Sequence, residues 1–300
     1  MEVLLEQALK NRTDLQEIRI RTRAPYFIKT GSGNYYIDEN GMFTGNIEKG
    51  IYCPDGMIEK ILNHVCMDSV YAFQDEIKKG YLTLSGGHRI GMVGHTVLDE
   101  NGQIITIKNI SGLNIRIAHE VVGVSDACLP YLYDENRLKN TLIIAPPGCG
   151  KTTMLRDLIR NISNGNAYGK PMQTAVVDER SEIAGSFRGM TQNDVGRHTD
   201  ILDSCPKKIG MMLLVRAMAP QVIALDELGL EEEISALYQV MNCGCKVVAT
   251  IHGDGIEDLK RRSGLVQVLQ NKIFERYIIM ASENGKIIVK EILNEDLTSC

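Results

Sequence analysis

Residues 145–152 combine the residue types needed to hold a phosphate chain. The run ends in Gly-Lys-Thr, follows a short apolar stretch at 141–144 and leads into a helical pattern at 153–160. This order of strand, glycine-rich loop and helix is typical of a P-loop, whose backbone N–H groups and helix N-terminus attract anions. We therefore predict a nucleotide phosphate site formed by Ala145, Pro146, Pro147, Gly148, Cys149, Gly150, Lys151, Thr152 and Thr153.

Three positions of this P-loop carry specific expectations. Lys151 is predicted to reach the terminal phosphates, and the Thr152 hydroxyl is predicted to bind Mg²⁺. Ala145 stands where the strict pattern has Gly. Because Ala resists a positive φ, the substitution weakens the pattern slightly. The alternative is a chance glycine-rich turn, which the flanking strand and helix patterns disfavour.

An acidic pair follows the apolar run at 222–225, 75 positions after Lys151. Asp226 is predicted to support the Mg²⁺ shell, and Glu227 is predicted to polarise the attacking water. Phosphoryl transfer needs little else, since it depends mostly on positioning and charge stabilisation. Without the P-loop, the same run would indicate a strand that ends in a solvated acidic turn.

A third cluster, Asp178, Glu179 and Glu182, comes directly after the apolar run at 174–177. Its carboxylates could hold Mg²⁺ through water or orient a nucleophile, and Arg180 between them could pair with one of them. Favourable charge at a helix N-terminus is the alternative.

Thr250 and His252 end a fourth apolar run, at 247–251. Either residue is predicted to sense the terminal phosphate, although a lone His is more often structural. Ligands of parallel sheets bind at the carboxyl ends of the strands. We therefore expect all four clusters to lie at one edge of a sheet.

The hydrophobic pattern changes near residue 137. Beyond it, short apolar strands alternate with helical patterns, which predicts an α/β domain with a mainly parallel sheet at 138–300. Before it, strand-like and helical patterns are mixed, which predicts a smaller α+β N-terminal domain at 1–137. The expected strands are 142–145, 174–177, 222–225, 247–251, 277–281 and 286–292, and the expected helices are 151–163, 207–218 and 230–241.

Within the first 137 residues, strand alternation runs through 15–28 and a helix is expected at 55–66. Strands at 89–98 and 103–107 flank an Asn-Gly turn, which predicts a hairpin, and a further strand is expected at 111–117.

The composition argues against several classes of protein, although it leaves room for a local basic groove. The formal net charge is −5 and Trp is absent, so neither a basic surface nor base-stacking aromatics are indicated. The N-terminus lacks the pattern of a signal peptide, and the longest apolar stretch, 211–225, is interrupted by Arg216 and Pro220. We expect no membrane-spanning segment. The eight cysteines lack a metal-type spacing and are interpreted as reduced cytosolic thiols.

The four motifs in this order resemble the secretion ATPases of type II and type IV systems, which are hexameric RecA-like motors. The acidic cluster is similar to their Glu-Asp-x-x-Glu pattern, with the first two acids exchanged as Asp178-Glu179. Asp226 stands where many members carry Gly, and 251–253 resembles their His box. From about residue 80, phrases such as 87–94 and 111–117 resemble more closely the motor-like members of endospore-forming bacteria.

The resemblance implies a RecA-like P-loop NTPase that binds ATP and Mg²⁺ and hydrolyses ATP. It also implies a cytoplasmic hexamer of the mother cell, held at the membrane by integral-membrane partners of a channel to the forespore. Arginines donated by the N-terminal domain are expected at the nucleotide, and the matching positions are Arg89 and Arg116. Without the resemblance, each would be interpreted as a solvated charge at a strand edge.

Three alternatives remain open from the residues. A nucleic-acid-directed P-loop ATPase would need a basic stripe on the N-terminal domain. A nucleotide-gated assembly scaffold would bind ATP with little turnover, and Glu227 argues against it, because a pure binder needs no water-activating acid. A small-molecule kinase is disfavoured by the absence of an Arg-rich, lid-like insertion.

Overall fold

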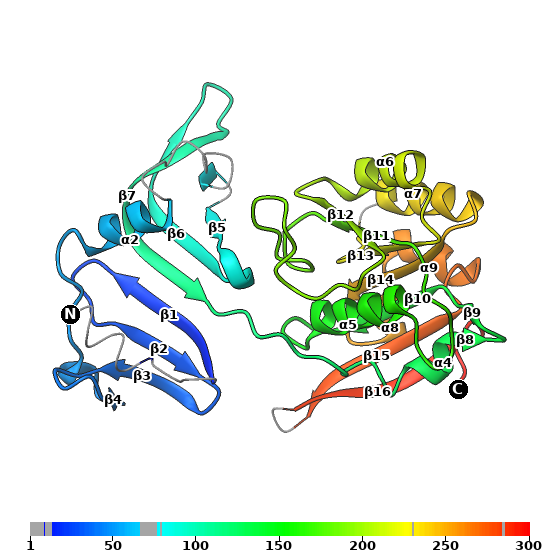
Figure 1. Cartoon of the computed structure of the whole chain (residues 1–300), viewed down its shortest axis with the longest axis horizontal. Coiled ribbons are helices and arrows are strands. Elements are labelled where there is room, and N and C mark those ends of the chain that lie inside the picture. The colour runs from blue at the N-terminus through cyan, green and yellow to red at the C-terminus, as the bar shows by residue number, and fades with distance from the viewer. Residues whose placement is uncertain (1–8, 10–13, 67–76, 79, 230, 284–285) are drawn as a thin grey trace. The chain divides into compact units, whose positions relative to one another are not determined.

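The computed structural model describes residues 9, 14–66, 77–78, 80–229, 231–283 and 286–300. The chain forms two compact units, Met1–His119 and Glu120–Cys300, and each has its own sheet (Figure 1).

The first unit contains an antiparallel sheet in the order β4-β3-β2-β1-β7-β6-β5. Alternation along β1 places Ile18 and Ile20 on the buried face, as a half-buried strand requires. Helix α2 (Met57–Val65) contacts β7. The strands are β1 (Leu15–Arg21), β2 (Phe27–Thr30), β3 (Gly33–Ile37), β4 (Phe43–Thr44), β5 (Tyr81–Thr83), β6 (Arg89–Leu98) and β7 (Ile104–Arg116).

The second unit contains a mainly parallel sheet in the order β12-β11-β13-β14-β10-β15-β16, so the α/β prediction is confirmed. Among the described strands of this sheet, β16 alone pairs antiparallel with its neighbour. The strands are β10 (Thr141–Ala145), β11 (Thr174–Asp178), β12 (Thr199–Asp203), β13 (Val222–Leu225), β14 (Lys246–His252), β15 (Arg276–Glu283) and β16 (Lys286–Asn294), and a short pair, β8 (Tyr133–Asp134) and β9 (Arg137–Leu138), stands apart.

Helices cover both faces of this sheet (Figure 1). Buried side chains of α6 (Lys207–Met218), α7 (Glu231–Asn242), α8 (Ile256–Leu259) and α9 (Ser263–Gln270) share one apolar cluster with Leu142 and Ile144 of β10. Those of α4 (Leu129–Leu132) and α5 (Lys151–Asn164) share another with Ile143. Successive residues of β10 thus pack into the apolar clusters on opposite faces of the sheet. This explains why the buried strands are continuously apolar.

Strands β7 and β12 differ from the sequence-based expectations in ways that the structure explains. Residues 111–116 are the second half of β7 and not a separate strand, because β7 runs on from Ile104 and pairs with both β6 and β1. The edge strand β12 was not predicted, since Thr199-Asp-Ile-Leu-Asp203 carries only two apolar residues and none of its residues is buried.

The division between the units falls 18 residues before the expected boundary at 137/138. The segment before β10 packs with the second unit, where Cys128, Leu129 and Leu132 are buried in the same cluster as α5. Local pattern alone does not reveal which core a short helix such as α4 joins.

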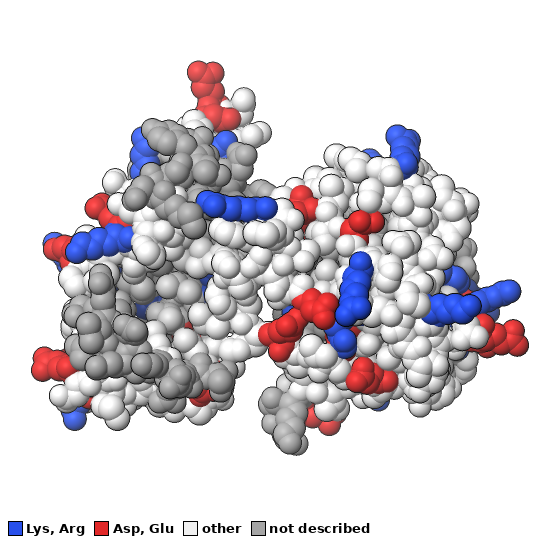
Figure 2. All heavy atoms as spheres, viewed as in Figure 1, with Lys and Arg blue, Asp and Glu red and all other residues white. Residues whose placement is uncertain are grey.

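Charged side chains of both signs are interspersed on the described part of the face in view, in each unit (Figure 2). That face therefore carries no continuous basic stripe among its described residues. No helix within the described ranges is long and apolar enough to cross a bilayer.

Candidate functional site

The P-loop joins the end of β10 to the start of α5. Gly148 and Gly150 adopt φ values of 76° and 70°, a backbone conformation that residues with a Cβ resist. Ala145 is the last residue of β10, is fully buried and has no positive φ. The backbone at this position therefore accepts Ala without strain, and the departure from the Gly pattern costs the loop nothing in backbone geometry.

Lys151 lies in the first turn of α5 and is 6% exposed. Burial lowers the pKa of its ammonium, and the nearby carboxylates of Asp226 and Glu227 oppose that effect. Its Nζ lies 2.9 Å from Nδ1 of His252, which ends β14. Because Nζ donates, Nδ1 accepts, and the ring proton therefore belongs on Nε2.

Glu227 follows β13 and has a φ of 56°. Its Oε1 lies 2.6 Å from Nε2 of His252, and its Oε2 lies 2.7 Å from a guanidinium nitrogen of Arg180. Lys151, His252 and Glu227 therefore form a continuous chain of polar contacts. Arg180, for which a pairing with a carboxylate of the acidic cluster was expected, forms an ion pair with Glu227.

Thr152, Asp226 and Thr250 bring oxygen atoms together beside the P-loop. The Thr152 hydroxyl donates to Oδ2 of Asp226 over 2.7 Å, and the Thr250 hydroxyl donates to Oδ1 of the same carboxylate. Thr250 also accepts from the backbone N–H of Glu227 over 2.9 Å. One fully buried hydroxyl thus holds both acids of the pair.

Mg²⁺ prefers oxygen ligands and keeps several waters, with one or two carboxylates and substrate phosphates completing its shell. The adjacent oxygens of Thr152 and Asp226 fit that requirement. Among the described residues, no group of three His, Cys, Asp or Glu side chains forms a complete protein cage.

Asp178 is 2% exposed, and its carboxylate accepts the backbone N–H groups of Glu182, Ile183 and Ala184 over 2.9, 3.1 and 2.8 Å. Burial raises its pKa to about 6, against the effect of these three donors. Both carboxylate oxygens thus accept hydrogen bonds from the backbone of the turn after β11. This contact gives Asp178 an anchoring role that its position in an acidic cluster does not indicate.

Glu179 and Glu182 lie on the same turn and line a small pocket with Arg180, Asp226 and Glu227. Oε2 of Glu179 lies 2.6 Å from Nζ of Lys207, which also lies 3.1 Å from Oε1 of Glu233. The Lys207 ammonium is mostly buried, and its carboxylate partners raise its pKa although burial lowers it. Lys207 thus ties the acidic turn to α6 and α7.

Arg156 is a site residue that the sequence reasoning missed. It lies on α5 and donates to the backbone carbonyls of Ile183 and Glu182, over 2.6 Å in each case. The P-loop helix is therefore bonded to the acidic turn. Burial lowers the pKa of its guanidinium and Asp178 partly restores it. An Arg five residues after Lys151 on a predicted helix was the available signal. Its partners are backbone carbonyls, however, and residue types do not reveal a contact with the backbone.

Arg89 and Arg116 lie directly opposite each other on β6 and β7 of the first unit. Directly opposed residues of an antiparallel pair point to the same face of the sheet. The guanidinium of Arg89 lies 3.4 Å from the centroid of the Tyr81 ring, a cation–π contact. The structure thus brings the two arginines together, and their role toward a nucleotide stays a prediction.

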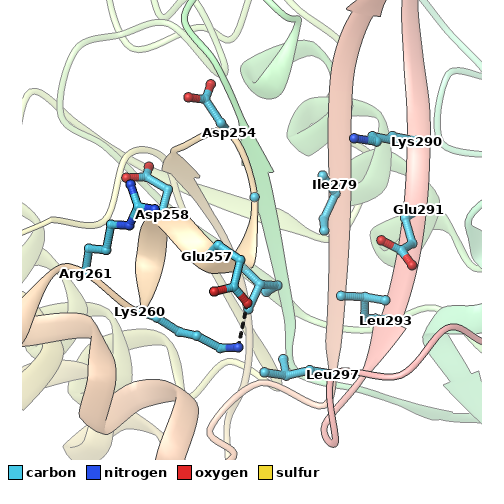
Figure 3. Close-up of a pocket in the computed structure, with 12 residues that line it drawn as sticks. Asp254, Glu257, Asp258, Lys260, Arg261, Ile279, Lys290, Glu291, Leu293 and Leu297 are labelled. Atoms are coloured by element: carbon cyan, nitrogen blue, oxygen red, sulfur yellow. Dashed lines mark hydrogen bonds and ion pairs between the residues drawn. The ribbon is translucent and has the colours of Figure 1, made fainter.

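A separate hollow begins just after the His box, between α8 and the β15–β16 hairpin (Figure 3). Its rim carries charges of both signs, and Lys260 and Glu257 pair across 2.7 Å. Ile279 and Leu293 contribute apolar surface. None of the site residues predicted from the sequence lines it.

Comparison with known proteins identifies the family. A model of the family described as sporulation stage III, protein AA, matches residues 1–298. The chain belongs to this family. Stage III sporulation protein AA of Bacillus subtilis (strain 168) is 39% identical over 284 residues, which cover 94% of this chain and 88% of the relative. The resemblance inferred from the sequence is confirmed.

Two solved structures are similar to this member of the family over most of its length. The ATPase DotB of Legionella pneumophila gives a TM-score of 0.60 at 15% identity and covers 99% of this chain and 80% of its own. The pilus retraction motor PilT with bound ADP gives a TM-score of 0.63 at 14% identity, and the match covers 96% of this chain and 80% of the PilT chain. At these identities the likeness establishes the RecA-like secretion-ATPase fold.

Proposed function

We propose that this chain is an ATP-hydrolysing motor of secretion-ATPase type that acts in sporulation. The observation that carries the proposal is the continuous contact chain from Lys151 through His252 to Glu227, beside the Thr152–Asp226 oxygen pair. Phosphate-binding, metal-binding and water-activating groups are thus all at the carboxyl ends of β10, β13 and β14.

Each residue has a distinct task in this mechanism. Lys151 and the loop N–H groups bind the phosphates. Thr152 and Asp226 would hold Mg²⁺, which would supply charge neutralisation at the phosphates. Glu227 orients the attacking water and takes its proton. His252 contacts both Lys151 and Glu227, so it is placed to link the phosphate site to the water-activating acid. Asp178 and Arg156 hold the acidic turn that carries Arg180.

The finer proposals concern assembly. We infer a closed ring, with six subunits by family likeness, in which Arg89 and Arg116 of one subunit stabilise charge on the nucleotide of its neighbour. The ring would be cytoplasmic and held at the membrane by integral-membrane partners of a channel between mother cell and forespore. The PilT and DotB likeness supports the motor class, and the family match supports the setting.

Glu227→Gln tests the proposal. The amide keeps the size of the side chain but is a much weaker base, so steady-state ATPase turnover should fall by about 10²-fold while MgATP still raises the melting temperature. Glu231→Gln is the matched control, because Glu231 is an exposed acid a few residues away on α7. Turnover that stays near normal in Glu227→Gln would remove the water-activating role. A parent protein that binds MgATP without turnover would favour the nucleotide-gated scaffold.

A further inference from the structure

A pocket lined mainly by apolar side chains opens beside the P-loop in the second unit. Met154 of α5 and Met280 of β15 are its most buried members, at 2% and 3% exposed. Val124 and Val289 contribute further apolar surface from the segment before α4 and from β16. The pocket volume, about 500 Å³, lies in the range of small-molecule sites.

This pocket is continuous with the P-loop. Gly150 and Thr153 line it, and both belong to the phosphate-binding run. A Cβ placed on Gly150 would lie 3.1 Å from Cδ1 of Ile287 on β16. The loop backbone therefore touches the hairpin that forms one side of the pocket. A phosphate chain held by the loop brings whatever is attached to it within reach of these apolar side chains.

The chemistry of the lining limits what it can recognise. Among the described lining residues, Thr153 carries the one hydroxyl, and no amide or charged side chain is present. Val121 and Ile287 are 47% and 51% exposed, so the pocket opens to solvent and a bound ring would keep water at its outer edge. The two methionines are unbranched and adapt to rings of different outline.

We propose that this pocket receives the base of the nucleotide, and that it binds bases through apolar contact without recognising the hydrogen-bonding groups on their edges. The inference rests on the proposed function, because it requires phosphates in the P-loop. It follows that purine triphosphates of different bases bind with similar affinity. A hydrophobic pocket rejects close analogues by at most about 10²-fold, whereas a site built for hydrogen bonds rejects them by about 10⁴-fold or more.

Isothermal titration of the full chain with MgATP, MgGTP, MgITP and magnesium tripolyphosphate tests the proposal. The three nucleotides should bind with dissociation constants within about tenfold of one another, and tripolyphosphate should bind at least tenfold more weakly. Val121→Ala should weaken all three nucleotides by about 3- to 10-fold and leave tripolyphosphate unchanged. Val122→Ala is the matched control, because Val122 is 58% exposed and does not line the pocket.

Three results would overturn the inference, and they are distinguishable. Discrimination of more than about 10³-fold between MgATP and MgGTP would mean that the site recognises base edges. Tripolyphosphate binding as tightly as MgATP would mean that the pocket does not hold the base. Both results would leave the P-loop assignment intact. Absence of binding by all four ligands would overturn the proposed function together with the base site.

Discussion

Thr250→Val tests whether one buried hydroxyl holds both acids of the candidate site. Thr250 is fully buried, donates to Asp226 and accepts the backbone N–H of Glu227 over 2.9 Å. Valine has nearly the same shape and keeps the packing, but it offers neither hydrogen bond. The variant therefore leaves the Glu227 N–H without its acceptor and removes one donor from the Asp226 carboxylate.

The expected magnitude follows from these two contacts. A buried N–H that loses its partner costs about 1–3 kcal/mol, and a hydrogen bond to a charged group contributes about 1.5–3 kcal/mol. Asp226 still accepts a hydrogen bond from the Thr152 hydroxyl, so the variant loses only part of the hydrogen-bond energy of this carboxylate. We expect the free energy of unfolding to fall by roughly 2–4 kcal/mol. Turnover should fall as well, because Glu227 and Asp226 lose the group that orients them.

Urea unfolding of the parent, Thr250→Val and Thr250→Ser measures the effect. Serine keeps the hydroxyl and loses one methyl group, which costs about 1 kcal/mol on its own. The hydroxyl argument requires Thr250→Ser to be more stable and more active than Thr250→Val. If the order is reversed in both assays, Thr250 contributes by packing and the proposed bridge does not position the acids.

Three further outcomes are expected. MgATP should raise the melting temperature of the parent, because ligand at a hundredfold excess over the dissociation constant stabilises the folded state by about 2.7 kcal/mol. Lys151→Ala should lose this increase, because the bound phosphates lose their counter-charge. An unchanged increase would refute the P-loop assignment. Arg89→Ala or Arg116→Ala should reduce turnover without unfolding the subunit, and mixing either with Lys151→Ala should restore part of it; no recovery in rings that exchange subunits would count against donation in trans. For Asp178, the pKa is raised in the folded protein from 3.8 to about 6, so its contribution to stability is present below about pH 4 and is lost as pH rises through 6. This loss is on the order of 3 kcal/mol, and urea unfolding should show a smaller decline between pH 4 and 7.5 in Asp178→Asn than in the parent; equal slopes would contradict the assignment.

Much of the second unit could be predicted from its sequence, because the signals are local. The P-loop, the continuously apolar strands and the helical pattern after Lys151 are set by neighbouring residues, and they appear as β10, β11, β13, β14 and α5. The expectation that polar residues follow strand ends in a parallel sheet brought Lys151, Asp226, Glu227 and His252 together correctly. The edge strand β12 was missed, because an edge strand without buried residues has little apolar signal.

The individual contacts were decided by tertiary structure. Strand order places β14 between β10 and β13, so Thr250 meets Asp226 and His252 meets both Lys151 and Glu227. Residues of α4 share a buried cluster with α5, so the segment before β10 belongs to the second unit, which begins at Glu120.

The contacts of the acidic turn, which follows β11, could not be predicted from the sequence either. Asp178 accepts three backbone N–H groups, and Arg180 pairs with Glu227, which lies 47 positions away. Residue types specify which groups can bond. Which of several possible partners each group meets depends on strand order and on the path of the backbone in a turn, and neither is encoded in the spacing of a motif.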